Sequence, residues 1–169
     1  IFLFGGSQGS AFLNKMMNKI VPNISNAGIQ VIWQTGELEY NRYKMMNSDS
    51  VRIVPFVINM DDAYAVSDLL ICRSGALTLA EITVCGKPSI LVPFPHAAGN
   101  HQTKNAKVLV DAGAARMFLE KSLSSTDMLH AIMNLIHDKK ELNKMGLASK
   151  GLGKPNATRE IVDNIFEVM

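Results

Sequence analysis

The chain has 169 residues, of which 47% are apolar and 19% charged, a composition typical of one globular domain with a substantial core rather than of a disordered chain. Its formal net charge of +2 does not indicate a nucleic-acid partner. No apolar run reaches the roughly 18 residues that a membrane-spanning helix needs. Cys72 and Cys85 lie in apolar contexts without a CxxC or Cys/His cluster, so we expect buried thiols, a reducing compartment and no metal site.

The chain opens with a strand, a glycine-rich turn and a helix. Residues 1–4 are apolar and predict a buried strand, residues 5–10 read GGSQGS, and an amphipathic helical pattern follows. Ser7, Gln8 and Gly9 occupy a turn that suits a phosphate group, although its glycine spacing is not that of the dinucleotide fingerprint. The turn also matches G-x-S-x-G, the nucleophile elbow of hydrolases, with Ser7 at the centre. Because the first strand has no lead-in, we expect the chain to be the second part of a longer protein.

Short apolar runs and helical patterns then alternate. Pro22 is predicted to weaken the end of the first helix. Residues 29–33 and 51–56 predict strands, residues 37–47 predict a helix between them, and Asn59 is predicted to cap the helix that follows it.

A second strand–turn–helix unit spans residues 68–93. The apolar run 69–72 predicts a buried strand, residues 73–75 a tight turn and residues 76–85 a helix, and residues 89–92 predict the next strand. Together they form one βαβ unit.

The turn of this unit is a candidate ligand site. Ligands of open α/β sheets bind beyond the carboxyl ends of the strands, and the start of a helix offers unpaired N–H groups to an anion. Gly75 would let a ligand approach the backbone, and Ser74 and Thr78 carry hydroxyl donors. Glu81 lies about one turn into the helix and leans toward its N-terminus. Its carboxylate could accept hydrogen bonds from a sugar diol, or it could simply complement the helix dipole.

The remaining chain continues the alternation. The predicted elements after Pro93 are a polar loop over 94–105 leading into a helix, a strand over 114–119, a helix capped by Ser124 or Ser125, a helix over 139–150 and a last amphipathic helix from Asn156. About six strands alternating with seven helices predict an α/β fold, a Rossmann-like parallel sheet of about six strands with helices on both faces. We expect the last helix to pack against a domain outside this chain, which would leave its apolar face exposed here.

Five motifs occur in order: GGSQGS at 5–10, F-x-x-x-M-x-x-A-Y-A-x-S-D at 56–68, RSGALTLAE at 73–81, GKPSILVPFPHA at 86–97 and HQTKNA at 101–106. As a set they resemble the bacterial MurG family, transferases that add N-acetylglucosamine (GlcNAc) from UDP-GlcNAc to lipid I and so form lipid II for peptidoglycan. The resemblance covers the whole chain and corresponds to the C-terminal, donor-binding half of the two-domain GT-B fold. It implies that residues 1–169 are a single UDP-GlcNAc-binding domain.

The resemblance also implies roles for individual residues. Glu81 would accept hydrogen bonds from the two ribose hydroxyls, Ser7 would contact the phosphates, and the backbone near Val57 would pair with the uracil edge, with Met60 beside it. The helix start would lie under the pyrophosphate, and the loop from residue 101 would contact the GlcNAc hydroxyls. The predicted substrate-binding residues are Ser7, Gln8, Gly9, Val57, Met60, Ser74, Gly75, Ala76, Leu77, Thr78, Glu81, His101, Gln102 and Asn105.

In this family an N-terminal domain contributes to catalysis, binds lipid I and faces the membrane. The resemblance therefore places the catalytic residues outside this chain, on a peripheral protein at the cytoplasmic face of the bacterial inner membrane. It implies inverting transfer without a metal or other cofactor, and no sugar transfer by this chain alone. Three alternatives stay open at this point: an α/β-hydrolase that uses Ser7, a nucleotide-sugar epimerase of GT-B fold, and the donor-binding subunit of a two-subunit GlcNAc transferase.

Overall fold

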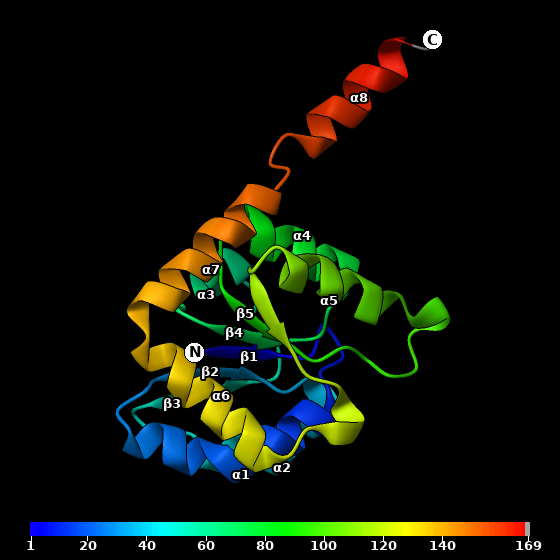
Figure 1. Ribbon diagram of the computed structural model, residues 1–169. Helices are drawn as coiled ribbons and strands as arrows, with labels where there is room; N and C mark the ends of the chain where they lie inside the picture. The colour runs from blue at the N-terminus through cyan, green and yellow to red at the C-terminus, as the bar shows by residue number, and fades with distance from the viewer. Residues whose placement is uncertain (168–169) are drawn as a thin grey trace.

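The computed structural model describes residues 1–167 (Figure 1). Its centre is one sheet of six parallel strands in the order β3-β2-β1-β4-β5-β6. The strands are short and mostly buried on both faces, as expected for a parallel sheet covered by helices. Their bounds are β1 Phe2–Phe4, β2 Val31–Gln34, β3 Val51–Val54, β4 Leu70–Cys72, β5 Ser89–Leu91 and β6 Ala115–Met117.

Eight α-helices and three short 3-10 helices connect and follow the strands within residues 1–167. The predicted alternation is therefore confirmed, and each helical segment expected along the chain corresponds to one of these α-helices. The α-helices are α1 Ala11–Asn26, α2 Glu37–Tyr43, α3 Met60–Val66, α4 Ala76–Cys85, α5 His101–Asp111, α6 Ser125–His137, α7 Lys139–Leu152 and α8 Ala157–Glu167. The 3-10 helices are η1 Lys44–Met46, η2 Ala98–Asn100 and η3 Glu120–Ser122.

The sheet separates two hydrophobic clusters. One joins the sheet to α1 and α6 and contains Trp33, whose indole N–H donates to Asn14 Oδ1 at 2.9 Å. The other joins the opposite face to α3, α4 and α5 and contains Tyr64, Phe2 and Phe4. Helices thus cover both faces of the sheet, as predicted (Figure 1).

Three local predictions about helix ends can be compared directly. The first helix does not weaken at Pro22 but continues to Asn26, because its buried face extends to Ile24. Asn59 occupies the N-cap position of α3, as predicted, but its side chain makes no capping hydrogen bond. Ser124 does cap α6, in a reciprocal capping box with Asp127.

The predicted burial of both cysteines holds for one only. Cys72 is fully buried in β4, whereas Cys85 is exposed, because in the last turn of α4 it lies with Val84 on the solvent side while Ile82 and Thr83 are buried. Both are free thiols.

The last helix stands away from the rest of the molecule. Figure 1 shows α8 projecting beyond α7, and its apolar residues Ile161, Val162, Ile165 and Phe166 are exposed. Within residues 1–167, none of the helices has the length and apolar character that crossing a bilayer requires.

Candidate functional site

The strand order places a crevice between β1 and β4. From β1 the chain crosses to β2 and β3 on one side, and then returns to β4 on the other side of β1. Such a reversal of direction is where open parallel sheets bind their ligands, beyond the carboxyl ends of the strands. The turns after β1 and β4, residues 5–10 and 73–75, meet at this point.

The turn after β1 is held tightly against the exit of β2. Ser7 and Gln8 are exposed at its tip, and the Gly9 N–H donates to the Gly6 carbonyl at 3.0 Å. Gly9 has a φ of +76°, and a Cβ there would lie 2.0 Å from the carbonyl oxygen of Thr35. Only glycine therefore fits at position 9, and the exposed tip is fixed in space for a ligand.

A buried amide joins this turn to the segment after β3. Gln34, at the end of β2, is 2% exposed. Its Nε2 donates to the Gly6 carbonyl at 3.0 Å, and its Oε1 accepts from the Val57 N–H at 2.9 Å. Val57 and Met60 are half-buried against the core beneath them. The backbone N–H of Val57 is therefore already paired within the protein. The sequence predicted neither this hydrogen bond nor the structural role of Gln34.

The start of α4 is open to an anion. Its N-cap is Gly75, which offers no capping side chain, and no acidic residue lies in the first turn. Ala76 and Leu77 are exposed, with Leu77 at 75%. A Cβ on Gly75 would meet nothing nearer than Thr78 Oγ1, at 3.9 Å. Packing within the protein therefore does not require glycine at position 75. A ligand that approaches the backbone N–H groups would require it, because a side chain there would block the approach.

Glu81 lies farther along α4 and is half-buried. The Tyr64 hydroxyl on α3 donates to Glu81 Oε2 at 2.8 Å. Burial raises the pKa of Tyr64 above its ordinary value, and the hydrogen bond to Glu81 and the charge of its carboxylate raise this pKa further. The phenol is therefore a permanent hydrogen-bond donor at neutral pH.

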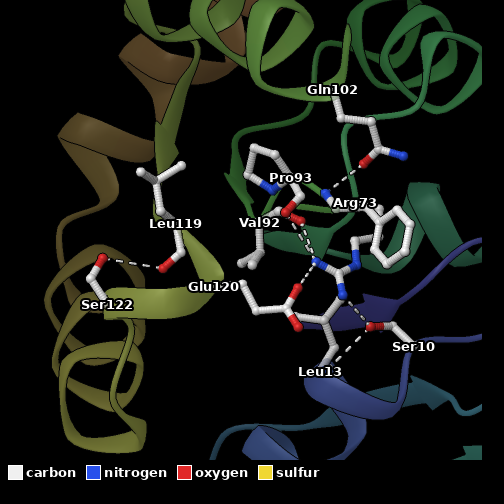
Figure 2. A network of polar contacts seen from close by, with 10 residues as sticks. Ser10, Leu13, Arg73, Val92, Pro93, Gln102, Leu119, Glu120 and Ser122 are labelled. Atoms are coloured by element: carbon white, nitrogen blue, oxygen red, sulfur yellow. Dashed lines mark hydrogen bonds and ion pairs between the residues drawn. The ribbon is translucent and has the colours of Figure 1, made fainter. Parts of the chain in front are cut away.

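Arg73, directly after β4, ties several segments of this edge together (Figure 2). It is 9% exposed, and its Nη1 donates to the carbonyl oxygens of Val92 and Pro93 and to the Glu120 carboxylate at 3.0, 3.2 and 2.8 Å. Its Nη2 donates to Ser10 Oγ, the N-cap of α1, at 2.9 Å. One buried guanidinium thus fixes the first glycine turn relative to the exit of β5.

The start of α5 is attached to the same turn. Ser74, fully buried, donates its hydroxyl to the carbonyl oxygen of Gln102 at 2.8 Å, and Asn105 Nδ2 donates to the Ser74 carbonyl at 3.2 Å. Gln102 Oε1 accepts from the Phe94 N–H at 2.9 Å, and His101 is exposed. The structure therefore brings the predicted residues to one edge, while giving the Ser74 hydroxyl a partner inside the protein.

Two other kinds of site can be compared with this edge, a metal site and a groove away from it. No group of three or more His, Cys, Asp and Glu side chains that could hold a metal ion occurs among the described residues. A groove of about 820 Å³ lies at the opposite, amino ends of β4 and β5, against α7, and its lining contains none of the predicted site residues.

The hydrolase alternative lacks a catalytic partner for Ser7. Among the hydrogen bonds of residues 1–167, none joins Ser7 to a histidine. The rings of His101 and His137 instead contact the carbonyl oxygens of Ala98 and Met133, both at 2.8 Å. A serine nucleophile needs an adjacent base, so this geometry does not support hydrolysis.

The parallel sheet, the glycine turn and the uncapped helix start define an α/β domain of the Rossmann type. Residues 1–162 match the glycosyltransferase family 28 C-terminal domain, and the chain belongs to this family. The predicted fold class, the C-terminal domain of a GT-B glycosyltransferase, is confirmed.

Two relatives named as GlcNAc transferases can be aligned with essentially the whole chain. They come from Chlorobium phaeobacteroides and Bacillus cytotoxicus and are 40% and 41% identical, over 99% and 100% of the chain. Both carry the name UDP-N-acetylglucosamine–N-acetylmuramyl-(pentapeptide) pyrophosphoryl-undecaprenol N-acetylglucosamine transferase. These matches cover 46% and 47% of the relatives, so the chain spans about half their length.

Solved structures agree with this assignment. MurG of Acinetobacter baumannii has a TM-score of 0.83 and 29% identity, with 98% of this chain and 49% of that chain covered. The resemblance to the MurG family is therefore confirmed. Glycosyltransferase VinC, solved in complex with dTDP, has a TM-score of 0.69 at 15% identity over 99% of this chain and 41% of VinC, which shows the shared fold alone.

Proposed function

We propose that this chain is the UDP-GlcNAc-binding domain of an inverting transferase that adds GlcNAc to lipid I to form lipid II. The observation that carries the proposal is the pairing, at one sheet edge, of an uncapped helix start at Gly75 with the Glu81 carboxylate six residues further along. The helix start suits a diphosphate, and the carboxylate suits a pair of ribose hydroxyls. The names of the relatives supply the identity of the sugar and of the acceptor.

In the proposed reaction, the hydroxyl of the lipid I sugar attacks the anomeric carbon of GlcNAc, and the bond from that carbon to the UDP oxygen breaks. Negative charge then builds on the diphosphate. The N–H groups at the start of α4 and the turn around Ser7 would stabilise this charge. Glu81 would hold the ribose and take no part in proton transfer. Val57 and Met60 would flank the uracil, and His101, Gln102 and Asn105 would contact the GlcNAc hydroxyls.

In the proposed protein, this chain binds the donor and a second domain binds the acceptor. The base that deprotonates the acceptor, the lipid I site and the membrane-facing surface would lie in a partner domain, on a peripheral protein at the cytoplasmic face of the inner membrane. The exposed apolar residues of α8, such as Ile161 and Phe166, are consistent with contact to such a domain. The proposal includes no cofactor or metal. The epimerase and two-subunit alternatives gain no support from the names of the relatives.

Calorimetric titration of UDP-GlcNAc, UDP and ADP into this chain tests the proposal. We expect the two uridine ligands to bind and ADP to bind far more weakly. Charge-assisted hydrogen bonds contribute about 1.5–3 kcal/mol, so Glu81→Ala should weaken UDP binding about ten- to hundredfold. Glu141→Ala, on α7 and outside the site, is the matched control and should bind normally. Equal binding of ADP, or full affinity in Glu81→Ala, would contradict the proposal.

A further inference from the structure

The contact between Tyr64 and Glu81 has features that helix packing alone does not require. The two residues come from different helices, α3 and α4, and lie 17 residues apart in sequence. A phenylalanine would fill the same apolar space under β1. The hydroxyl instead donates to Glu81 Oε2 at 2.8 Å.

The tyrosine is held rigidly from below. It is 2% exposed, and its ring lies against those of Phe2 and Phe4 with centroid distances of 6.1 and 6.0 Å. Both phenylalanines belong to β1, the strand that leads into the glycine turn. The hydroxyl therefore has a fixed position relative to the crevice, and any group that it binds is fixed as well.

A neutral donor suits a carboxylate that has to bind a ligand. The ion pairs among the described residues join Arg42 to Glu39 and Arg73 to Glu120, and neither includes Glu81. The Tyr64 hydroxyl thus orients the Glu81 carboxylate without cancelling its charge. An arginine or lysine in its place would fix the carboxylate equally well but would compete with the hydroxyls of a ligand.

We propose that Tyr64 is a positioning residue for recognition of the ribose diol: it anchors Glu81 Oε2, so that the carboxylate presents its remaining acceptor positions to the two hydroxyls. The inference rests on the proposed function, because it assigns the ligand side of Glu81 to the ribose of the nucleotide. Tyr64 itself does not contact the nucleotide. Its contribution is to restrict the carboxylate to the orientation in which both hydroxyls can bind.

The test compares UDP with 2′,3′-dideoxy-UDP, which lacks both hydroxyls, in titrations of the whole chain. In the wild type, UDP should bind about ten- to hundredfold more tightly than the dideoxy analogue. In Tyr64→Phe this ratio should fall about three- to tenfold, with the affinity for the analogue nearly unchanged. Tyr43→Phe is the matched control, a buried tyrosine of the other cluster whose ring packs on Trp33, and should keep the wild-type ratio.

The ratio of the affinities for UDP and the dideoxy analogue distinguishes a positioning role of Tyr64 from a purely structural one. If Tyr64 were merely structural, Tyr64→Phe would weaken UDP and the dideoxy analogue equally, and an unchanged or increased ratio overturns the inference. Glu81→Ala supplies the second comparison. If the wild type shows no preference for UDP, or Glu81→Ala keeps that preference, the ribose role of Glu81 fails and the inference fails with it. If Glu81→Ala loses the preference and Tyr64→Phe keeps it, only the inference on Tyr64 is refuted.

Discussion

Replacing the buried guanidinium by a methionine, Arg73→Met, should be among the most destabilising single changes at this edge. The substitution keeps the apolar length of the side chain but removes the donor to two backbone carbonyls, to Ser10 Oγ and to the Glu120 carboxylate. Removing one partner of a buried ion pair costs about 3–5 kcal/mol. Because the Glu120 side chain is 21% exposed and can recover water, we expect the lower end, about 3 kcal/mol.

Glu120→Gln should cost less, about 1–2 kcal/mol, because the amide oxygen still accepts from Arg73 while the charge attraction is lost. The double variant Arg73→Met/Glu120→Gln should be little less stable than Arg73→Met alone, since the two residues share one interaction. Arg52→Met, an exposed arginine on β3, is the matched control and should change stability by less than about 0.5 kcal/mol.

Urea unfolding measured by tryptophan fluorescence gives these free energies. Trp33 is the sole tryptophan and is fully buried, so its emission reports loss of the core. If Arg73→Met cost less than about 1 kcal/mol, or if the two single changes added fully in the double variant, the account of Arg73 as the link between segments would be refuted.

Three further results are expected. Gly9→Ala should cost more than about 3 kcal/mol in urea unfolding, because its Cβ would meet the Thr35 carbonyl, whereas Gly28→Ala, with a similar φ of +75° and open space around it, should cost about 1–2 kcal/mol. Gly75→Ala should change the free energy of unfolding by less than about 1 kcal/mol yet weaken UDP binding in calorimetry; unchanged affinity would argue against a diphosphate at that helix start. Because the pKa of Tyr64 is raised in the folded state, its contribution to stability is present below about pH 10 and lost as pH rises further, so wild-type stability should fall more steeply above pH 10 than that of Tyr64→Phe.

The strands, the glycine turns and the sheet class could be predicted because they depend on local pattern. Apolar runs that end in polar turns mark buried parallel strands wherever they occur, and the strands from β1 to β6 follow this rule. The same rule indicated the turns around Ser7 and Gly75 as candidate ligand sites, whereas the predicted positions in the segments 57–60 and 101–105 came from the resemblance to the MurG family.

The contacts that fix the site could not be predicted in this way, because they join residues distant in sequence. Arg73 lies 47 residues from Glu120, and Gln34 lies 23 residues from Val57. A polar residue at the end of an apolar strand is the signal that both share, and it identifies the candidate without identifying its partner. Cys85 illustrates the same limit, because an apolar local context does not show which face of a helix meets the core.

A crystal structure of this chain with UDP-GlcNAc bound would locate the donor site. We expect the diphosphate between the turn around Ser7 and the N–H groups at the start of α4, with both ribose hydroxyls within hydrogen-bonding distance of Glu81. A nucleotide bound in another place, for example in the groove between α7 and the amino ends of β4 and β5, would contradict this expectation.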